Sequence, residues 1–456
     1  MSDTAGNSIP LMGEFTVEVQ HLGITEQLPL LVSRIDNMPP IMGTNWFEKV
    51  DLDFNSIFSN ITFAEDGKTQ NFIAERKEKP NPVQITYDLP SKTTIPSRPP
   101  DGAYLFGSIF YMLVVCSHVA FNSDSHQVRG PIIWQDEFEF LDYGKWMHLI
   151  TAWRGGNQEF QYYHNLTENS YVRDGVLYIK PTLTADRFSE DFLYNGELDL
   201  NQEGCNVDWE GGCYVAAGEE IINPIQSARM VTSDSFSFTY GTIEIRAKMP
   251  KGDWIWPAIW MKPTDNIYGN WPRSGEIDIV EMKGNANFSC NGNPIGRQLA
   301  GSTLHWGPDP SQDRWRLSHW EKIIEEPDFS SDFHIYRVDW LPNGFHFYID
   351  KELIGEMFPP AGGFWELGGF DGDNLWISGS NLAPFDQRFH FLLNVAVGGN
   401  FFPDGCQNAD YEKPWTASDP TQMTKFWESR DKWLPTWNAE TDDNTMQVDY
   451  IRVYQL

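Results

Sequence analysis

From about residue 131 to the C-terminus, the chain consists of short runs in which apolar and polar residues alternate, separated by Gly, Pro and Asn. A period of two places the apolar residues on one face of a strand, so these runs predict half-buried strands. The clearest runs are residues 171–179, 241–249, 345–350 and 446–454. Helical patterning is sparse, and we expect one helix near Thr421–Trp427. Many short strands separated by turn residues predict an all-β domain, either a sandwich or a jelly roll.

Residues 1–102 differ from the rest of the chain. They contain few Trp residues and end in a stretch rich in Pro and Ser, residues 90–100, which predicts an extended linker. Phe15–Val19 alternates like a short strand. We expect an N-terminal segment of unknown role, either a small module or a partly disordered leader.

Residues 103–121 form a hydrophobic segment in which Gly107, Ser108, Ser117 and His118 are the exceptions. The segment approaches the length of a membrane span. Three interpretations remain open: a signal-anchor helix, a secretory signal whose true start is nearer Met112, or a buried segment of a soluble fold. The first makes the protein type II membrane-anchored with an extracellular catalytic domain, and the second makes it secreted, which is the localisation we expect.

The formal net charge of -31 and the pI of about 4.5 restrict the classes of possible partner. A strongly anionic protein repels polyphosphate, so we expect no nucleic acid partner. Sulfated glycans are disfavoured for the same reason, and a neutral polymer fits best.

Aromatic residues make up 14% of the chain, including 19 Trp. Core packing explains most of them, but flat aromatic faces also stack on sugar rings.

The five cysteines do not have the spacing of a zinc site. Cys205 and Cys213 flank a short Gly-rich loop, and if they close it, Cys290 and Cys406 are left for a second pair. Such disulfides require an oxidising compartment. Three glycosylation sequons agree with export: Asn60, Asn165 and Asn287.

The run from Gly275 to Glu281 carries the candidate chemistry. Glu276 and Asp278 share one face of a strand, whereas Glu281, five residues after Glu276, points away. Glu281 rejoins that face if a β-bulge near Ile279–Val280 inserts one extra residue. The intervening isoleucines then bury on the opposite face.

Crowded carboxylates repel one another, which keeps at least one of them protonated near neutral pH. Retaining glycoside hydrolysis needs this pair of states. We expect Glu276 to be the nucleophile, Glu281 the acid/base, and Asp278 to tune the nucleophile. Three acids could instead bind calcium or form a solvated face. The density of indoles just upstream argues against a solvated face: Trp254, Trp256, Trp260 and Trp271.

The run Pro272–Glu281 resembles the active-site signature of glycoside hydrolase family 16. Its surroundings resemble the animal branch, which contains endo-1,3-β-glucanases (laminarinases) and the β-1,3-glucan and lipopolysaccharide recognition proteins of innate immunity. The resemblance covers about residues 131–456, taken as the catalytic domain, and includes residues 160–163, 169–172, 226–229, 252–261, 302–307, 394–399, 402–404 and 448–454.

The resemblance implies a concanavalin-like jelly-roll β-sandwich of two curved antiparallel sheets with a groove across the concave face. It places Arg229, Trp256 and Trp260 on the donor side of that groove and His305 beside the acid/base. Trp306 and Asn394 are further candidates for substrate binding. No cofactor is required, but relatives carry a structural calcium on the convex face, for which Asp449 and Glu137 are the candidates here.

The chain departs from the family pattern in three places. Gln158 stands before Glu159 where relatives commonly have Trp, which removes an expected stacking contact. Residues 211–215 differ from the usual sequence around Cys213, which affects the shape of a loop at the groove edge. The N-terminal glucan-binding module of many insect recognition proteins is not apparent in residues 1–102.

The retained carboxylates distinguish two functions. Recognition proteins of this branch typically lose one or both glutamates, whereas Glu276, Asp278 and Glu281 are all present here. Crowded acids are electrostatically unfavourable and would not be kept without a catalytic use, so we expect an active enzyme. The expected reaction is hydrolysis of internal bonds of β-1,3-glucan with retention. We expect the protein to be a monomer. The alternative is a non-catalytic pattern-recognition protein that uses the same groove. A digestive and an immune role both remain open.

Overall fold

The computed structural model describes residues 11–21, 24–33, 41–42, 61–65, 70–74, 83–87, 130–408, 411–438 and 441–456. The chain divides into two compact units, Met1–His126 and Gln127–Leu456. Each unit is described by itself.

In the first unit, the described strands form a six-stranded sheet. The order is β3 (Ile41–Met42), β2 (Ile24–Ser33), β1 (Leu11–His21), β6 (Val83–Tyr87), β5 (Gln70–Ala74), β4 (Ile61–Glu65). β1 contains the strand predicted at Phe15–Val19. The proposed linker at 90–100, the hydrophobic segment at 103–121 and the sequon at Asn60 lie outside the described residues. Within the described part of the chain, no helix is long and apolar enough to cross a bilayer.

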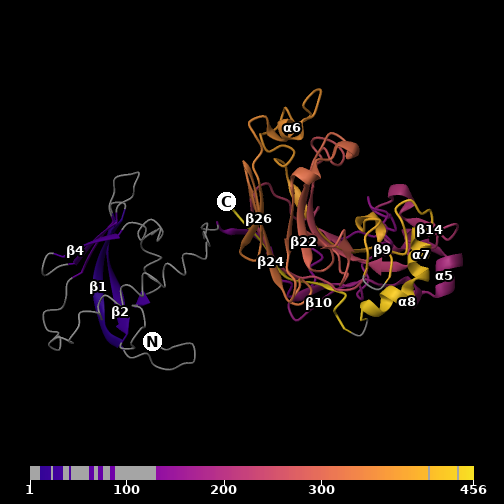
Figure 1. The fold of residues 1–456 in the computed structure, drawn as a ribbon, viewed down its shortest axis with the longest axis horizontal. Helices are drawn as coiled ribbons and strands as arrows, with labels where there is room; N and C mark the ends of the chain where they lie inside the picture. The colour runs from indigo at the N-terminus through magenta and orange to yellow at the C-terminus, as the bar shows by residue number, and fades with distance from the viewer. Residues whose placement is uncertain are drawn as a thin grey trace. The chain divides into compact units, whose positions relative to one another are not determined.

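The second unit is built on two large antiparallel sheets (Figure 1). The seven-stranded sheet has the order β23 (His319–Ile323), β22 (Leu299–His305), β19 (Glu276–Met282), β18 (Ile255–Pro263), β27 (Phe389–Val397), β16 (Arg229–Val231), β8 (Met147–His148). The eight-stranded sheet has the order β10 (Ser170–Arg173), β11 (Val176–Ile179), β28 (Met446–Tyr454), β17 (Gly241–Lys248), β24 (His334–Leu341), β25 (Gly344–Ile349), β26 (Glu352–Met357), with β7 (Ile132–Asp136) also paired to β28.

Smaller elements decorate this framework. The short strands are β9 (Gln161–Tyr163), β12 (Thr182–Leu183), β13 (Glu197–Asp199), β14 (Tyr214–Ala216), β15 (Ile225–Ser227), β20 (Ser289–Cys290) and β21 (Asn293–Pro294). The helices are α4 (Thr184–Arg187), α5 (Glu190–Asn195), α6 (Gly363–Gly368), α7 (Gln422–Glu428) and α8 (Arg430–Trp433). The 3-10 turns are η1 (Asn201–Glu203), η2 (Trp209–Gly211), η3 (Pro310–Gln312), η4 (Trp315–Leu317), η5 (Gly399–Phe401) and η6 (Leu434–Thr436). Helices α5, α7 and α8 gather at one end of the unit beside β9 and β14 (Figure 1).

The alternating runs form the strands predicted for them. Residues 171–179 make the β10–β11 hairpin, 241–249 contain β17, 345–349 of the run 345–350 lie in β25, and 446–454 are β28. The turn of the hairpin is Asp174–Gly175, whose φ angles of 53° and 76° match the hand of twist that a two-residue hairpin requires. The predicted helix near Thr421–Trp427 is α7.

The core lies between the two large sheets. β19 contacts β24 across it, and the inward residues Ile277 and Ile279 are 0% and 1% exposed. Most of the tryptophans pack here: Trp254, Trp306 and Trp340 are fully buried and make edge-to-face contacts with neighbouring aromatic rings. The aromatic richness of the sequence is therefore chiefly a property of the core. The carboxylates of β19 are left on the outer face of the seven-stranded sheet.

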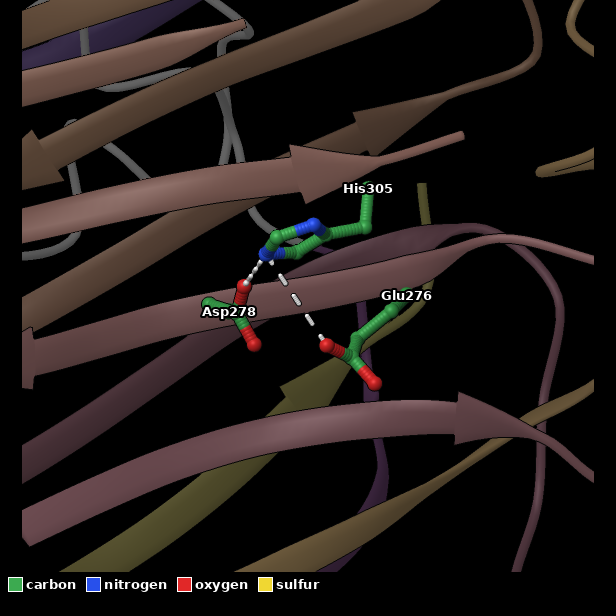
Figure 2. A group of neighbouring side chains, drawn as sticks. All are labelled: Glu276, Asp278 and His305. Atoms are coloured by element: carbon green, nitrogen blue, oxygen red, sulfur yellow. Dashed lines mark ion pairs between the residues drawn. The ribbon is translucent and has the colours of Figure 1, made fainter. Parts of the chain in front are cut away.

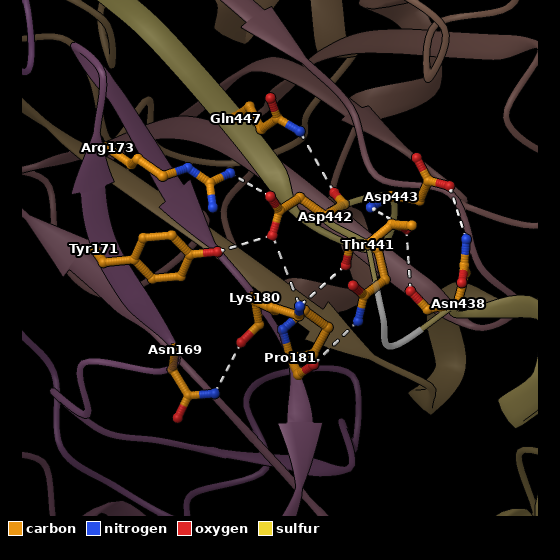
Figure 3. Close-up of polar contacts among 11 residues, drawn as sticks. Asn169, Tyr171, Arg173, Lys180, Pro181, Asn438, Thr441, Asp442, Asp443 and Gln447 are labelled. Atoms are coloured by element: carbon orange, nitrogen blue, oxygen red, sulfur yellow. Dashed lines mark hydrogen bonds and ion pairs between the residues drawn. The ribbon is translucent and has the colours of Figure 1, made fainter.

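A polar network fixes the last strand (Figure 3). Asp442 pairs with Arg173 and accepts a hydrogen bond from the Tyr171 hydroxyl at 3.1 Å. The Lys180 ammonium donates to the carbonyl of Thr441 at 3.1 Å. The segment before β28 is thus attached to the β10–β11 hairpin, although more than 250 residues separate them in sequence. This attachment anchors the segment that leads into β28.

Both proposed cysteine pairs are present as disulfides. Cys205 bonds to Cys213 and Cys290 bonds to Cys406, at sequence separations of 8 and 116. The second bond ties β20, beyond the end of β19, to the loop after β27. Cys116 lies outside the described residues.

The two disulfides should contribute unequally to stability. Because a longer closed loop removes more entropy from the unfolded chain, replacing Cys290 and Cys406 by Ser should cost about 2 kcal/mol more than replacing Cys205 and Cys213. Urea unfolding followed by tryptophan fluorescence measures this difference, since 18 of the 19 Trp residues lie beyond residue 126. Equal destabilisation by the two double variants would contradict the loop-length argument.

Candidate active site

The strand register brings the three carboxylates to one face. Trp260 of β18 pairs with Asp278, but the preceding Ile259 pairs with Val280, so Ile279 is an extra residue in β19. The pairing with β22 shifts between the same positions, Asp278 and Glu281. This is the β-bulge that the spacing required. Glu281 therefore returns to the face that carries Glu276 and Asp278, while Ile279 remains in the core.

His305, on β22, stands directly across from Glu276 in the strand register. Its Nε2 lies 3.3 Å from a carboxylate oxygen of Asp278 and 4.0 Å from one of Glu276, and Figure 2 shows the imidazole directed at both. Its Nδ1 lies 2.6 Å from Asp313. Asp313 also accepts hydrogen bonds from the backbone of Trp306 and Trp315, which hold it in place. Two carboxylates thus fix the orientation of the ring.

Glu281 has a different environment. The indole nitrogen of Trp256 donates a hydrogen bond to it at 2.9 Å. The ring of Trp256 stacks on Phe401, with centroids 4.0 Å apart and planes 8° apart. The ammonium of Lys283 lies 3.7 Å from the centre of the Phe401 ring. The stacking of Trp256 on Phe401 therefore positions the indole N–H that donates to the Glu281 carboxyl.

The electrostatics separate the two glutamates. Burial raises the pKa of Glu281 to about 8, and the charge of Asp278 adds to the rise. Burial also raises the pKa of Glu276, but His305 and Lys262 oppose that rise. Burial lowers the pKa of His305, yet pairing with its carboxylate neighbours raises it to about 12, so the imidazolium stays charged. Glu281 is then the carboxyl that retains a proton at neutral pH, while the adjacent cations favour the ionised form of Glu276.

Asp278 is the most deeply buried of the three acids, with 2% exposure. Burial and repulsion from Glu276 raise its pKa, while His305 opposes the rise. Its position between the glutamates couples their charges. A proton on Asp278 makes an ionised Glu276 easier to hold, so the three acids and His305 behave as one titrating unit.

A second polar group occupies the strands beyond Trp260. The side-chain oxygen of Asn394 accepts hydrogen bonds from Trp260 at 2.8 Å and from Arg229 at 3.2 Å. Arg229 also donates to the Tyr163 hydroxyl at 3.1 Å and lies 3.6 Å from Glu159. The structure thus brings Arg229, Trp260 and Asn394 together on the carboxylate face. Asn394 is 2% exposed, so in this arrangement it orients its neighbours.

The substrate contact predicted for Trp306 is wrong. Trp306 is fully buried, and its indole nitrogen donates to Ser318 at 2.8 Å while its ring packs on Phe364. His305 and Trp306 are adjacent in sequence, and adjacent residues of an extended chain point to opposite sides. Since His305 faces the carboxylates, Trp306 must face the core.

The two acids predicted as calcium ligands are both paired with arginines. Glu137 pairs with Arg452 through both carboxylate oxygens, at 2.7 and 2.8 Å, and Asp449 pairs with Arg246 at 2.6 Å. Arginines already neutralise both acids, and a cation would have to displace them. Within the described residues, the group with metal-ligand geometry is Glu276, Asp278 and His305.

The sequence did not point to several groups in this site. Asp313 follows β22 in an irregular loop, where no periodicity marks its direction. Lys262, Lys283 and Phe401 act on the carboxylates from neighbouring strands or turns. For Lys262 and Lys283 the signal was available, because each lies two residues beyond a residue of the outer face, Trp260 and Glu281 respectively. For Phe401 no local signal exists, since its contact with Trp256 depends on the pairing of β18 with β27.

Comparison with known proteins agrees with this geometry. Residues 201–360 match the model of glycosyl hydrolases family 16. The chain is 45% identical over 339 residues to the beta-1,3-glucan-binding protein of Penaeus monodon, covering 71% of this chain and 90% of that protein. It is 32% identical to beta-1,3-glucan-binding protein 1 of Galleria mellonella, of which it covers 64%, less than two thirds. It is 29% identical to glucan endo-1,3-beta-glucosidase A1 of Niallia circulans, of which it covers 38%.

The Penaeus alignment spans nearly the whole of that relative, and the family match includes the β19 carboxylates. The chain belongs to glycoside hydrolase family 16.

Proposed function

We propose that this protein is a retaining endo-1,3-β-glucanase. The observation that carries the proposal is the bulge in β19, because it places Glu276 and Glu281 on one face with different partners. A face with one carboxyl held protonated and one held ionised has the two states that retaining hydrolysis needs.

In the proposed mechanism, Glu276 attacks the anomeric carbon while Glu281 donates its proton to the departing glycosidic oxygen. A covalent glycosyl-enzyme forms on Glu276. Glu281, now ionised, takes a proton from water, which attacks the same carbon and releases Glu276. His305 stabilises the Glu276 carboxylate before it attacks and again when water releases it, and the Trp256 indole stabilises the ionised state of Glu281.

The substrate class follows from the surface and the relatives. The chain carries a formal charge of -31, which favours a neutral polysaccharide. Proteins named for binding β-1,3-glucan and for cleaving it both resemble this chain. We therefore assign β-1,3-glucan as substrate and partner.

The names of the animal relatives favour a second candidate, a non-catalytic protein that binds β-1,3-glucan. Such a protein would use the same face for recognition. Binding alone does not explain why three acids are buried together, because the charge on one acid raises the free energy of ionising its neighbours. For this reason hydrolysis is the function we place first.

An extracellular location fits both candidate functions. Two disulfides favour an oxidising compartment, and the described sequon residues Asn165 and Asn287 are exposed. A secreted protein would lose segment 103–121 and a membrane-anchored protein would keep it. This segment lies outside the described residues.

The variant Glu276→Gln should lose laminarin hydrolysis by about 10³-fold or more while its affinity for laminarin changes little, because the amide keeps the shape and cannot attack. Reducing-end assays and affinity electrophoresis measure the two effects. Glu139→Gln, which removes one exposed carboxylate beyond β7, is the matched control and should behave like the wild type. Comparable turnover by Glu276→Gln would refute its role as nucleophile, and an inactive wild type that binds laminarin would favour the second candidate.

Azide should distinguish the two glutamates. With an aryl β-1,3-linked disaccharide, whose leaving group needs no proton, Glu281→Ala should still form the glycosyl-enzyme, and azide should then give the β-glycosyl azide. In Glu276→Ala, azide should attack in place of the missing carboxylate and give the α-glycosyl azide. NMR of the products reads the anomer. Products of the opposite configurations would reverse the two assignments.

The pH profile should be bell-shaped. Activity needs protonated Glu281, so it should fall as pH rises above about 8, and it needs ionised Glu276, so it should also fall at low pH through a pKa raised by burial. The Trp256 hydrogen bond favours the ionised form of Glu281. Trp256→Phe should therefore move the alkaline limb of kcat/KM to higher pH and leave the acid limb in place. A shift of the acid limb instead would show that Trp256 acts on another group.

A further inference from the structure

Trp209 is a large apolar side chain held out in solvent. It lies in the turn η2 (Trp209–Gly211) and is 66% exposed. The turn belongs to the loop that the Cys205–Cys213 disulfide closes. A second indole, the half-buried Trp153, lies beside it with ring centroids 6.3 Å apart and planes 38° apart. The two rings form an exposed aromatic pair on the Gln127–Leu456 unit.

The loop that carries Trp209 is firmly fixed. Its Gly212 carbonyl accepts a hydrogen bond from the Ala152 backbone at 2.7 Å, and its Val207 carbonyl accepts one from the Thr151 hydroxyl at 2.7 Å. A Cβ added to Gly212 would come within 2.4 Å of that hydroxyl, so the loop packs directly on residues 151–153. With the disulfide, these contacts hold the indole at the surface. An immobilised aromatic ring binds with little further loss of conformational entropy.

The strand register connects this pair to the catalytic carboxylates. Glu281 pairs with Ala258, Ala258 with Asn394, and Asn394 with Arg229, in one row across the sheet. The Leu149 backbone then donates to the Arg229 carbonyl and ends the row. At about 4.8 Å per strand, Leu149 lies about 19 Å from Glu281 along the sheet.

From Leu149 the chain leads, through Thr151, to Trp153 of the aromatic pair. Thr151 bridges to Tyr163, whose hydroxyl accepts a hydrogen bond from Arg229. The side chains of Thr151 and Trp153 both lie against Gly212 of the disulfide loop. A polymer that crosses the strands from the carboxylates over Arg229 reaches the edge of the sheet from which this segment leads to Trp153 and Trp209.

We propose that Trp153 and Trp209 form a distal sugar platform that binds β-1,3-glucan several residues from the bond that is cut. This inference rests on the proposed function, because it uses the same polysaccharide. Flat indoles match the C–H faces of sugar rings. The exposed acids beside Trp209, Asp208 and Glu210, can accept hydrogen bonds from hydroxyl groups and would repel an anionic chain. Two rings are too small an area for a stable protein interface, which favours sugar over a protein partner.

A distal platform predicts a dependence on chain length. Trp209→Ala should raise KM for laminarin by about 3- to 10-fold, the size of effect expected from losing one aromatic contact. The same variant should leave kcat/KM for the aryl disaccharide unchanged, because that substrate does not reach the platform. The Cys205→Ser/Cys213→Ser variant, which frees the loop, should show the same pattern. Phe358→Ala, another exposed aromatic residue, follows β26 of the other sheet and serves as control.

The outcomes separate this inference from the proposed function. Unchanged KM for laminarin in Trp209→Ala would overturn the platform and leave the enzyme assignment standing. An equal loss on the polymer and the aryl disaccharide would show a structural role and would also overturn it. If the wild type binds laminarin without cleaving it, affinity electrophoresis replaces KM, and Trp209→Ala should weaken binding by the same factor. If the wild type does neither, the proposed function and the platform fail together.

Discussion

A regular strand presents alternate residues on one face, so Glu276 and Glu281, five positions apart, would lie on opposite faces of β19. The extra residue at Ile279 removes this conflict, and the rest of the site depends on it. Without the bulge, Glu281 would enter the core between the two sheets and Val280 would turn outward, to the face of Glu276 and Asp278. The partner strands accommodate the bulge, since β18 resumes its pairing at Val280 and β22 resumes its pairing at Glu281. The local chemistry is thus a consequence of sheet register.

Once the carboxylates share a face, their surroundings decide what each can do. Burial raises the pKa of all three acids, which alone would leave them protonated and inert. His305 carries a positive charge held in place by Asp313, and it lies against Asp278 and Glu276 rather than Glu281. Glu281 instead meets the neutral indole of Trp256, backed by Phe401. The asymmetry between a cation on one side and an indole on the other produces two roles from one residue type.

Much of this could be predicted from local sequence because the determining interactions are local. Period-two runs specified the strands, the spacing of Glu276 and Glu281 required a bulge, and the loop between Cys205 and Cys213 was short enough to close. Predictions that depended on which way a loop residue points were less secure. Trp306 follows the last residue of β22 and turned into the core, and Asp313, the partner of His305, lies where no periodic pattern exists. The arginine partners of Glu137 and Asp449 come from strands that meet those acids through sheet pairing, which sequence spacing does not encode.

The configuration of the first product of glucan hydrolysis tests the central claim most directly. If the bulge brings Glu276 and Glu281 together as nucleophile and acid/base, the wild-type protein must release a β-anomer first, which then mutarotates. Proton NMR during the first minutes of laminarin cleavage resolves the two anomers. Initial β-anomer is the result that the account predicts. Initial α-anomer would mean that water attacks directly and that Glu276 is not a nucleophile, and would contradict it.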